Sequence, residues 1–117
     1  MTVSQVEPLF ILFSGTNDAI VYTPIIGNAI RELSEMLKED ADLEDERLPF
    51  VIAAIANFRY TQIVAAKDKI AFTPAGKINE THNGGQQFHF AKSLLDEYMK
   101  SIRSLLKDDL FSFVGIS

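Results

Sequence analysis

The stretch that decides the fold is LPFVIAAIANFRYTQIVAAKDK, residues 48–69. Its apolar side chains are not confined to one stripe of a 3.6-residue repeat. They surround most of the circumference, which is typical of a helix buried in the centre of a domain. Acidic residues just before the stretch favour the positive end of a helix dipole, and lysines at its end favour the negative one. We therefore predict a central, buried helix around which the rest of the chain packs.

Two segments upstream carry the spacing of amphipathic helices. In residues 4–15, SQVEPLFILFSG, Ser4 can serve as the N-cap, apolar positions then recur at helical intervals, and a glycine ends the pattern. Residues 24–37 repeat this amphipathic pattern. The second helix begins either near Asp18, with a kink at Pro24, or at Pro24 itself, a residue suited to a first helical turn.

A last amphipathic helix is predicted over residues 86–109, QQFHFAKSLLDEYMKSIRSLLKDD. No strand pattern alternates with these helices, which argues against an α/β fold. The length of 117 residues is that of one domain. We therefore predict an all-α fold, a small bundle of about four helices in a single domain over residues 1–117.

The connection before the last helix is unusual. Residues 69–87 read KIAFTPAGKINETHNGGQQ, and a structureless connection beyond roughly 15 residues is usually functional or disordered. We predict an extended arm or short hairpin over residues 69–78, with a turn at residues 73–76, and a polar hinge over residues 79–87. The tail, residues 108–117, is too apolar to remain in solvent, and we expect it to dock on this subunit or on another. The side chains expected at a protein interface are Ile70, Phe72, Pro74, Ile78, Phe111, Phe113 and Ile116.

Composition and charge restrict the function. A net charge of −5 argues against a protein that grips nucleic acid, because neutralising phosphates requires a basic face. The sequence has no cysteine, which excludes a disulfide framework, a thiolate zinc site and a cysteine nucleophile. The longest apolar runs are shorter than the roughly 20 residues of a membrane span, and no basic segment of a signal peptide opens the chain. We expect a cytoplasmic protein without a membrane partner.

Three patterns that could carry chemistry are incomplete. Residues 40–51 resemble a calcium loop but have neither the glycine at its sixth position nor the glutamate at its twelfth. His82 and His89, the two histidines, would need convergent carboxylates to hold a metal. Glu32-x-x-Glu35 resembles one half of the magnesium pattern of all-α nucleotide pyrophosphohydrolases, and the second half is missing. We therefore predict no catalytic residue, no metal ligand and no cofactor, and we do not expect an enzyme.

Three pieces of sequence, in their order along the chain, carry a resemblance. They are D-x-R-L-P-x-x-x-A-A-I-A-x-x-R-Y over residues 45–60, KIAFTPAGKI over residues 69–78, and AKSLLDEYMKSIRSLLKDDLFSFVGI over residues 91–116. This order resembles the head-tail connector family of tailed phages and prophages, also called adaptor or head-completion proteins. The resemblance covers nearly the whole chain, but it consists of apolar patterns and includes no catalytic signature.

The correspondence can be followed segment by segment. The family has an alanine-rich helix with an R-Y pair, here Arg59-Tyr60, followed by an extended segment, here residues 72–78. An amphipathic helix and an apolar terminus complete it, the latter at residues 106–116. The polar insertion THNGGQQ, residues 81–87, departs from the family pattern and leaves the length of the arm open.

The resemblance implies a structural subunit that works by assembly. Its partners would be identical copies in a ring, together with portal and tail or stopper proteins. DNA would pass through the ring without specific binding, and the subunit would be made in the host cytoplasm and incorporated into the virion. Two alternatives remain open: a cytoplasmic helical module that binds one protein partner or regulates it, and the all-α pyrophosphohydrolase.

Overall fold

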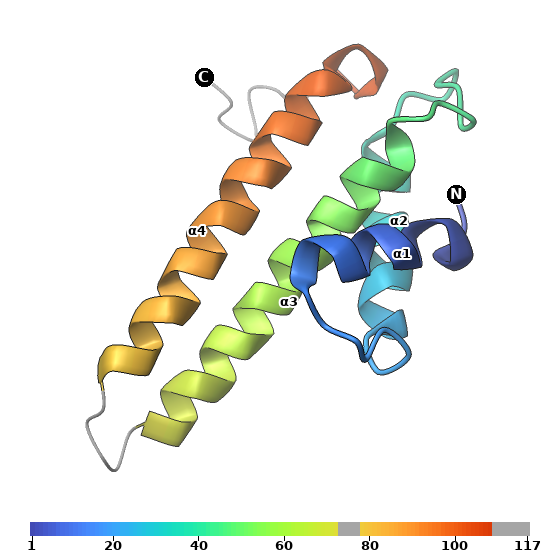
Figure 1. Cartoon of the computed structure of the whole chain (residues 1–117). Helices are drawn as coiled ribbons and strands as arrows, with labels where there is room; N and C mark the ends of the chain where they lie inside the picture. Colours follow the sequence, from blue (N-terminus) through green and yellow to red (C-terminus); the bar gives the residue numbers. More distant parts are fainter. Residues whose placement is uncertain (73–77, 109–117) are drawn as a thin grey trace.

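A computed structural model describes residues 1–72 and 78–108, with side chains described for residues 1–67 and 86–108. The helices are α1 (Val3–Ser14), α2 (Thr23–Met36), α3 (Leu48–Phe72) and α4 (Ile78–Ser101), followed by the short 3₁₀ helix η1 (Arg103–Leu105) (Figure 1). No strand occurs in these two described stretches. The prediction of an all-α bundle of about four helices is confirmed.

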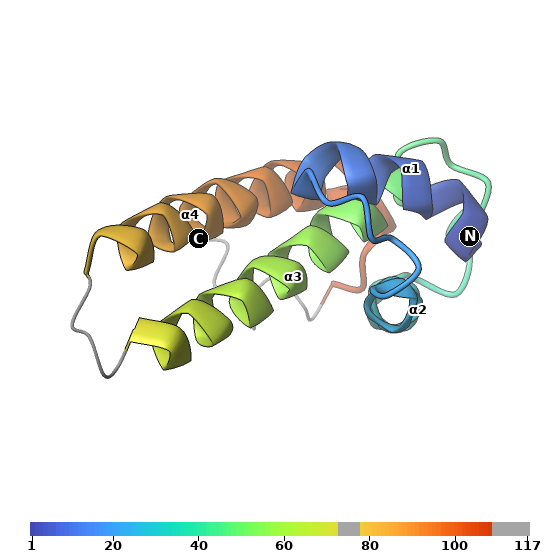
Figure 2. The same cartoon turned by 60° about the horizontal axis from the view of Figure 1, so that its bottom comes forward.

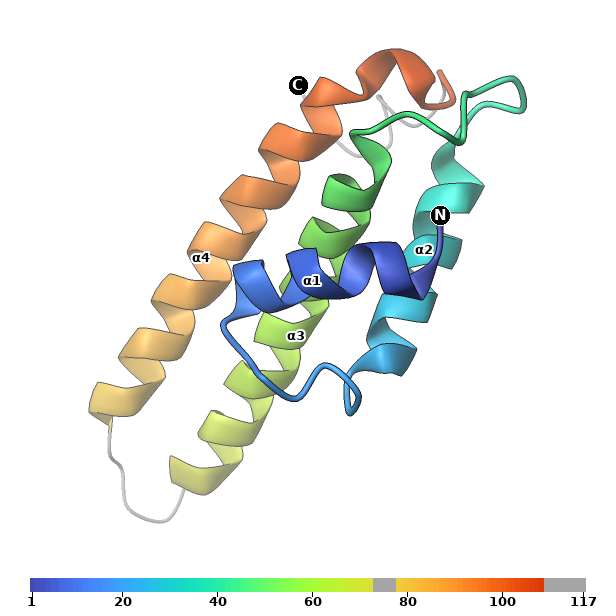
Figure 3. The same ribbon diagram turned by 45° about the vertical axis from the view of Figure 1, so that its right-hand side comes forward.

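The bundle is arranged around α3. Helix α4 runs antiparallel to α3 along most of its length. Helix α1 crosses the first half of α3, and α2 lies beside α3 (Figures 1 and 3). The C-terminal part of α3 and the N-terminal part of α4 extend beyond α1 and α2 as a two-helix projection (Figure 2). The radius of gyration is 15.4 Å, compared with about 13 Å for a compact domain of this length. The projection accounts for the elongated shape, 52 × 33 × 17 Å.

The core is apolar and centred on the first half of α3. Phe10 of α1 lies edge-on to Tyr60 of α3, with ring centroids 5.8 Å apart, and Tyr22 meets Tyr60 edge-on at 4.9 Å. Such edge-to-face pairs add to the free energy of burying the rings. The fully buried Ala53 and Ala56 leave room for neighbouring helices to approach. The remaining buried members of this core are Val6, Ile26, Ala29, Leu33, Leu37, Leu48, Val51, Ile52, Ile55, Met99, Ile102 and Leu106.

The helix starts correct one prediction and answer one question that the sequence left open. The N-cap of α1 is Thr2, not Ser4: the Thr2 hydroxyl accepts from the Gln5 amide, and the Gln5 side chain accepts from the Thr2 amide, a capping box that Ser4 does not form. Helix α2 starts at Thr23 with Pro24 in its first turn, so it does not begin near Asp18 and kink. Gly15 ends α1 in the left-handed conformation, with φ of 75°, as its position after the helix predicts.

The prediction of an extended arm between the last two helices is wrong for the residues that the structure describes there. Helix α3 continues to Phe72 and α4 begins at Ile78, so residues 69–72 and 78–87 are helical. Residues 73–77 lie outside the described part of the chain. Extending a helix already nucleated by a buried half costs little per residue. Each glycine of the pair within α4 costs about 1 kcal/mol relative to alanine, too little to stop a helix of 24 residues.

The chain after α4 departs from the predicted helix and returns to α2. Helix α4 ends at Ser101, not near residue 109, and the chain then crosses to Leu37, which forms an isolated antiparallel bridge with Leu106. On either side of it, the Lys38 amide donates to the Leu105 carbonyl and the Lys107 amide to the Met36 carbonyl, both at 2.9 Å. We call this contact the terminal bridge. The apolar residues 109–117, whose docking the sequence predicts, lie outside the described residues.

Helix α3 also meets a simple criterion for a membrane span. Leu48–Lys67 is long and apolar enough to cross a bilayer by length and composition, and 50% of this window is buried inside the bundle. In the structure its apolar side chains pack against α1, α2 and α4. Burial in the bundle therefore accounts for the hydropathy of this helix.

Candidate functional site

The interface residues predicted from sequence fall in two regions. Ile70 and Phe72 lie in the last turn of α3 and Ile78 is the first residue of α4, so the fold brings these three positions to the same end of the projection. Pro74, together with the tail residues Phe111, Phe113 and Ile116, lies outside the described residues. Contact of these positions with a partner stays a prediction.

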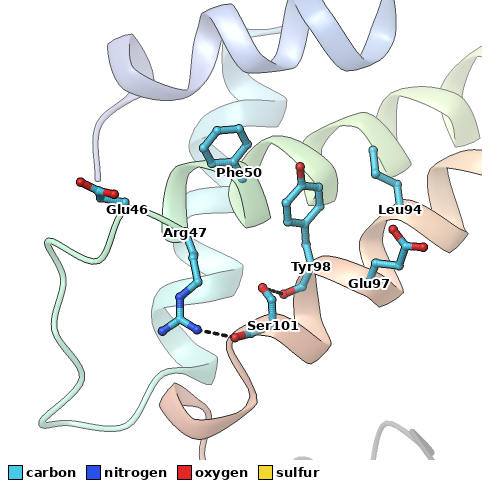
Figure 4. Close-up of a pocket in the computed structure, with 7 residues that line it drawn as sticks. All are labelled: Glu46, Arg47, Phe50, Leu94, Glu97, Tyr98 and Ser101. Atoms are coloured by element: carbon cyan, nitrogen blue, oxygen red, sulfur yellow. Dashed lines mark hydrogen bonds between the residues drawn. The ribbon is translucent and has the colours of Figure 1, made fainter.

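The surface grooves that described side chains line include three between the helices. The first, the Tyr98 groove, lies between the start of α3 and the end of α4 and has a volume of about 510 Å³ (Figure 4). The Phe50 ring stacks on the Tyr98 ring there, with centroids 5.9 Å apart. Its lining residues are Glu46, Arg47, Phe50, Leu94, Glu97, Tyr98 and Ser101.

Arg47 ties the two helices together at this groove. Its Nη2 and Nε donate to the two carboxylate oxygens of Asp45, at 2.8 and 3.0 Å. Its Nη1 donates to the Ser101 carbonyl at 2.5 Å (Figure 4). The Arg47 backbone amide also donates to Asp45, at 2.9 Å. The side-chain hydrogen bond from Arg47, with the backbone bond second, lowers the pKa of Asp45 to about 2. The charged carboxylate thus orients the arginine that holds the end of α4.

This arrangement predicts a specific titration. Because the pKa of Asp45 is lower in the folded chain than its ordinary value of 3.8, the contact stabilises the fold above about pH 4 and is lost as the pH falls towards 2. Carboxyl NMR titration of the folded protein should give a midpoint near 2 for Asp45, and Arg47→Met should return it to the ordinary range. Arg59→Met removes a guanidinium that pairs elsewhere and should leave the midpoint unchanged. A midpoint near 4 in the unmodified chain would contradict the geometry.

The second groove, the Phe90 groove, lies where α1 ends against α3 and α4. Its volume is about 240 Å³, and the Phe90 side chain at its rim is 74% exposed. On its floor Asn57 is only 5% exposed, and its Oδ1 accepts no hydrogen bond within the described part of the chain. A buried unpaired acceptor costs about 1–3 kcal/mol. The lining residues are Phe13, Ser14, Asn57, Tyr60, Thr61, Gln87, Phe90, Ala91 and Leu94.

Helix α4 contributes to both of these grooves through one stripe of residues. Leu94 lines both, and the α4 positions on either side of it recur at intervals of four and three residues. This is the spacing of a helix face that packs along another helix. The stripe consists of Gln87, Ala91, Leu94, Tyr98 and Ser101.

The third groove, the Arg59 groove, lies between α2 and α3 and has a volume of about 350 Å³. Arg59 donates to Glu32 of α2 at 2.8 Å and lies over the Phe58 ring, 5.8 Å from its centroid. At about 100° per residue, the α3 residues of this groove lie on the side of the helix opposite to those of the Phe90 groove. The lining residues are Ile25, Asn28, Arg59, Gln62, Ile63 and Ala66.

The residues considered for metal chemistry are separated. Glu32, the first carboxylate of the Glu32-x-x-Glu35 pattern, is in the ion pair with Arg59. His89 is exposed on α4. Among the residues with described positions, no three metal-ligating side chains gather at one place.

Sequence reasoning missed the two most informative residues of the Phe90 groove. Asn57 is the one polar residue in the run FVIAAIANF, and a polar residue in such a run is a signal for a buried polar group. Phe90 gave no signal, because an exposed and a buried aromatic residue look alike in a helix that carries apolar residues on several sides.

Comparison with known proteins provides no relative: no family model, no curated protein and no solved structure matches this chain.

Proposed function

We propose that the chain is a non-catalytic structural subunit of a tailed-phage or prophage head-tail connector. It assembles as a ring between portal and tail, and DNA passes through the ring. The proposal rests on the resemblance of the three sequence pieces, and one structural observation supports it best: two grooves, each lined by apolar and polar side chains, lie on opposite sides of α3.

Two opposite surfaces suit a ring for a geometric reason. In a cyclic assembly of identical subunits with head-to-tail contacts, each subunit presents one surface to the neighbour before it and a different surface to the neighbour after it. The Phe90 groove and the Arg59 groove are different surfaces of this kind. The net charge of −5 suits a DNA conduit, because repulsion of phosphates opposes binding that would stall passage.

Light scattering after size exclusion tests the assembly step. A concentration series, with and without the portal protein encoded by a neighbouring gene, should give a particle whose mass is a multiple of 13.1 kDa or a complex with the portal ring. Phe90→Glu places a charge in one groove and should reduce assembly at least about tenfold, since an unpaired charge in an interface costs well over 1.4 kcal/mol. Lys92→Glu, an exposed change on the same helix, is the control. A chain that stays monomeric and binds no portal, or a gene with no portal or capsid gene beside it, contradicts the proposal.

The α4 stripe favours a second candidate, a helical interaction module. An amphipathic helix of a single partner could lie along the stripe from the Phe90 groove to the Tyr98 groove, with apolar anchors at helical spacing. The two candidates differ in stoichiometry. A module gives a one-to-one complex with a different protein, whereas a connector subunit gives closed rings.

A further inference from the structure

The position where the tail leaves the bundle is fixed by the terminal bridge. Lys107 is hydrogen bonded to Met36 at the end of α2, and the carboxylate of Asp108 lies 3.8 Å from the Lys38 ammonium group. The backbone bonds at Leu105 and Lys107 hold this segment on both sides of Leu106. Asp108, the last described residue, therefore lies beside the C-terminal end of α2.

Helix α2 leads from this point to the Arg59 groove, because Ile25 and Asn28 in its first half line that groove. Ile102 and Leu106 share the core with Leu48 and Ile52 near the start of α3. Steps of three and four residues along the same side of α3 reach Ile55, which is still buried. They then reach Arg59, Ile63 and Ala66, which line the Arg59 groove.

The tail is long enough to cover this groove. From Ile52 to Ile63 the helix rises about 17 Å, at 1.5 Å per residue. An extended chain of the length of residues 109–117 spans at most about 30 Å. The tail can therefore reach the groove from its own bridge without any change in the bundle.

The chemistry of the groove matches that of the tail. Ile25, Ile63 and Ala66 provide apolar surface, and Asn28 and Gln62 also line the groove. The amide oxygens of Asn28 and Gln62 accept from Arg31 and Arg59, and their NH₂ groups can donate to the carbonyls of an extended backbone. After Asp109 the tail reads LFSFVGIS, and each buried leucine, phenylalanine or isoleucine contributes about 1.5–3 kcal/mol relative to exposure. Leaving these side chains in water would forfeit that free energy.

We propose that in the free subunit residues 109–117 fold back over their own chain and cover the Arg59 groove between α2 and α3. The tail of a second copy is the competing occupant. A segment attached directly beside its groove has an effective concentration in the millimolar range, so the chain's own tail prevails at lower protein concentrations. This inference concerns one isolated chain and does not depend on the connector function.

Site-specific cross-linking tests the contact. The chain contains no cysteine, so two introduced cysteines are the only thiols that can react. Ile63→Cys with Phe113→Cys, treated with a short bismaleimide at micromolar protein, should give a monomer with both thiols linked. The control pair is Phe90→Cys with Phe113→Cys, since Phe90 is on the other side of the bundle and 74% exposed. The first pair should link at least about tenfold faster than the control, as expected for a docked rather than a free tail.

The rate of maleimide labelling of a single introduced cysteine provides a second test that does not need the double-cysteine variants. Deleting residues 109–117 should accelerate maleimide labelling of Ile63→Cys several-fold and leave that of Phe90→Cys unchanged. Equal linking rates for the two pairs, or unchanged labelling at position 63, would overturn the proposal. Links that form only between two chains would assign the groove to the tail of a second copy and overturn it as well. All variants should keep the helical circular dichroism signal of the parent.

Discussion

Replacing Phe10 with alanine is expected to lower the free energy of unfolding by about 3–5 kcal/mol, which is a large part of the total stability of a domain this size. Phe10 is fully buried and contacts the rings of Tyr22 and Tyr60, at centroid distances of 6.1 and 5.8 Å. The change leaves a cavity at the point where α1, α2 and α3 meet. The midpoint of thermal unfolding should fall on the order of 15 °C.

The matched control for Phe10→Ala is Phe90→Ala. The Phe90 side chain is 74% exposed, and a surface change of this kind usually alters stability by no more than about 0.5 kcal/mol. Urea unfolding of both variants, followed by circular dichroism, provides the comparison. Similar midpoints for the two variants would mean that α1 does not pack on α3 as described.

Leu106→Ala is the second substitution with a large expected effect. Leu106 lies beyond the last helix but is only 1% exposed and belongs to the core. Truncating a buried leucine typically costs about 2–5 kcal/mol. Because the residue also holds the terminal bridge, the cross-link between positions 63 and 113 should become slower in the same variant.

The control for Leu106→Ala is Leu12→Ala, a leucine that is 71% exposed on α1. Chemical denaturation of the two variants should give a large loss for the first and almost none for the second. If Leu106→Ala behaves like Leu12→Ala, the segment after α4 is not part of the core, and the proposed path of the tail loses its starting point.

The central helix could be predicted from sequence because its signal is local and redundant. A helix that is apolar on most sides has one stable place in a water-soluble bundle, and each of many residues in α3 repeats that information. The same holds for α1 and α2, whose bounds differ from the prediction by a few residues. Thr2 and Ser4 both have a capping-box residue three positions later, Gln5 and Glu7 respectively, so the pattern alone does not separate them; in the structure the box forms at Thr2.

The connection between α3 and α4 could not be predicted by the same reasoning. Glycines and a proline suggested a long extended arm, but the described parts of residues 69–87 are helical. Local preferences are weak where two long helices lie side by side, and tertiary context routinely overrides them. Pro74 and Gly76 lie outside the described residues.

The candidate site was less predictable than the fold because it depends on contacts between distant residues. Nothing in the sequence pairs Arg47 with Ser101, Arg59 with Glu32, or Leu37 with Leu106. Arg59 and Tyr60 are adjacent in sequence, yet one lines a surface groove while the other packs in the aromatic core. The grooves result from such pairings and therefore required the structure.

The terminal bridge also has a consequence for the order of folding. It joins residues about 70 positions apart, and closing so long a loop costs more entropy than pairing helices that are neighbours in sequence. The helices can thus pack first, and the segment after α4 joins them last. The element that forms last is often the one that opens locally while the rest remains folded. A nascent subunit would complete its helical bundle before residues 105–107 are fixed against α2.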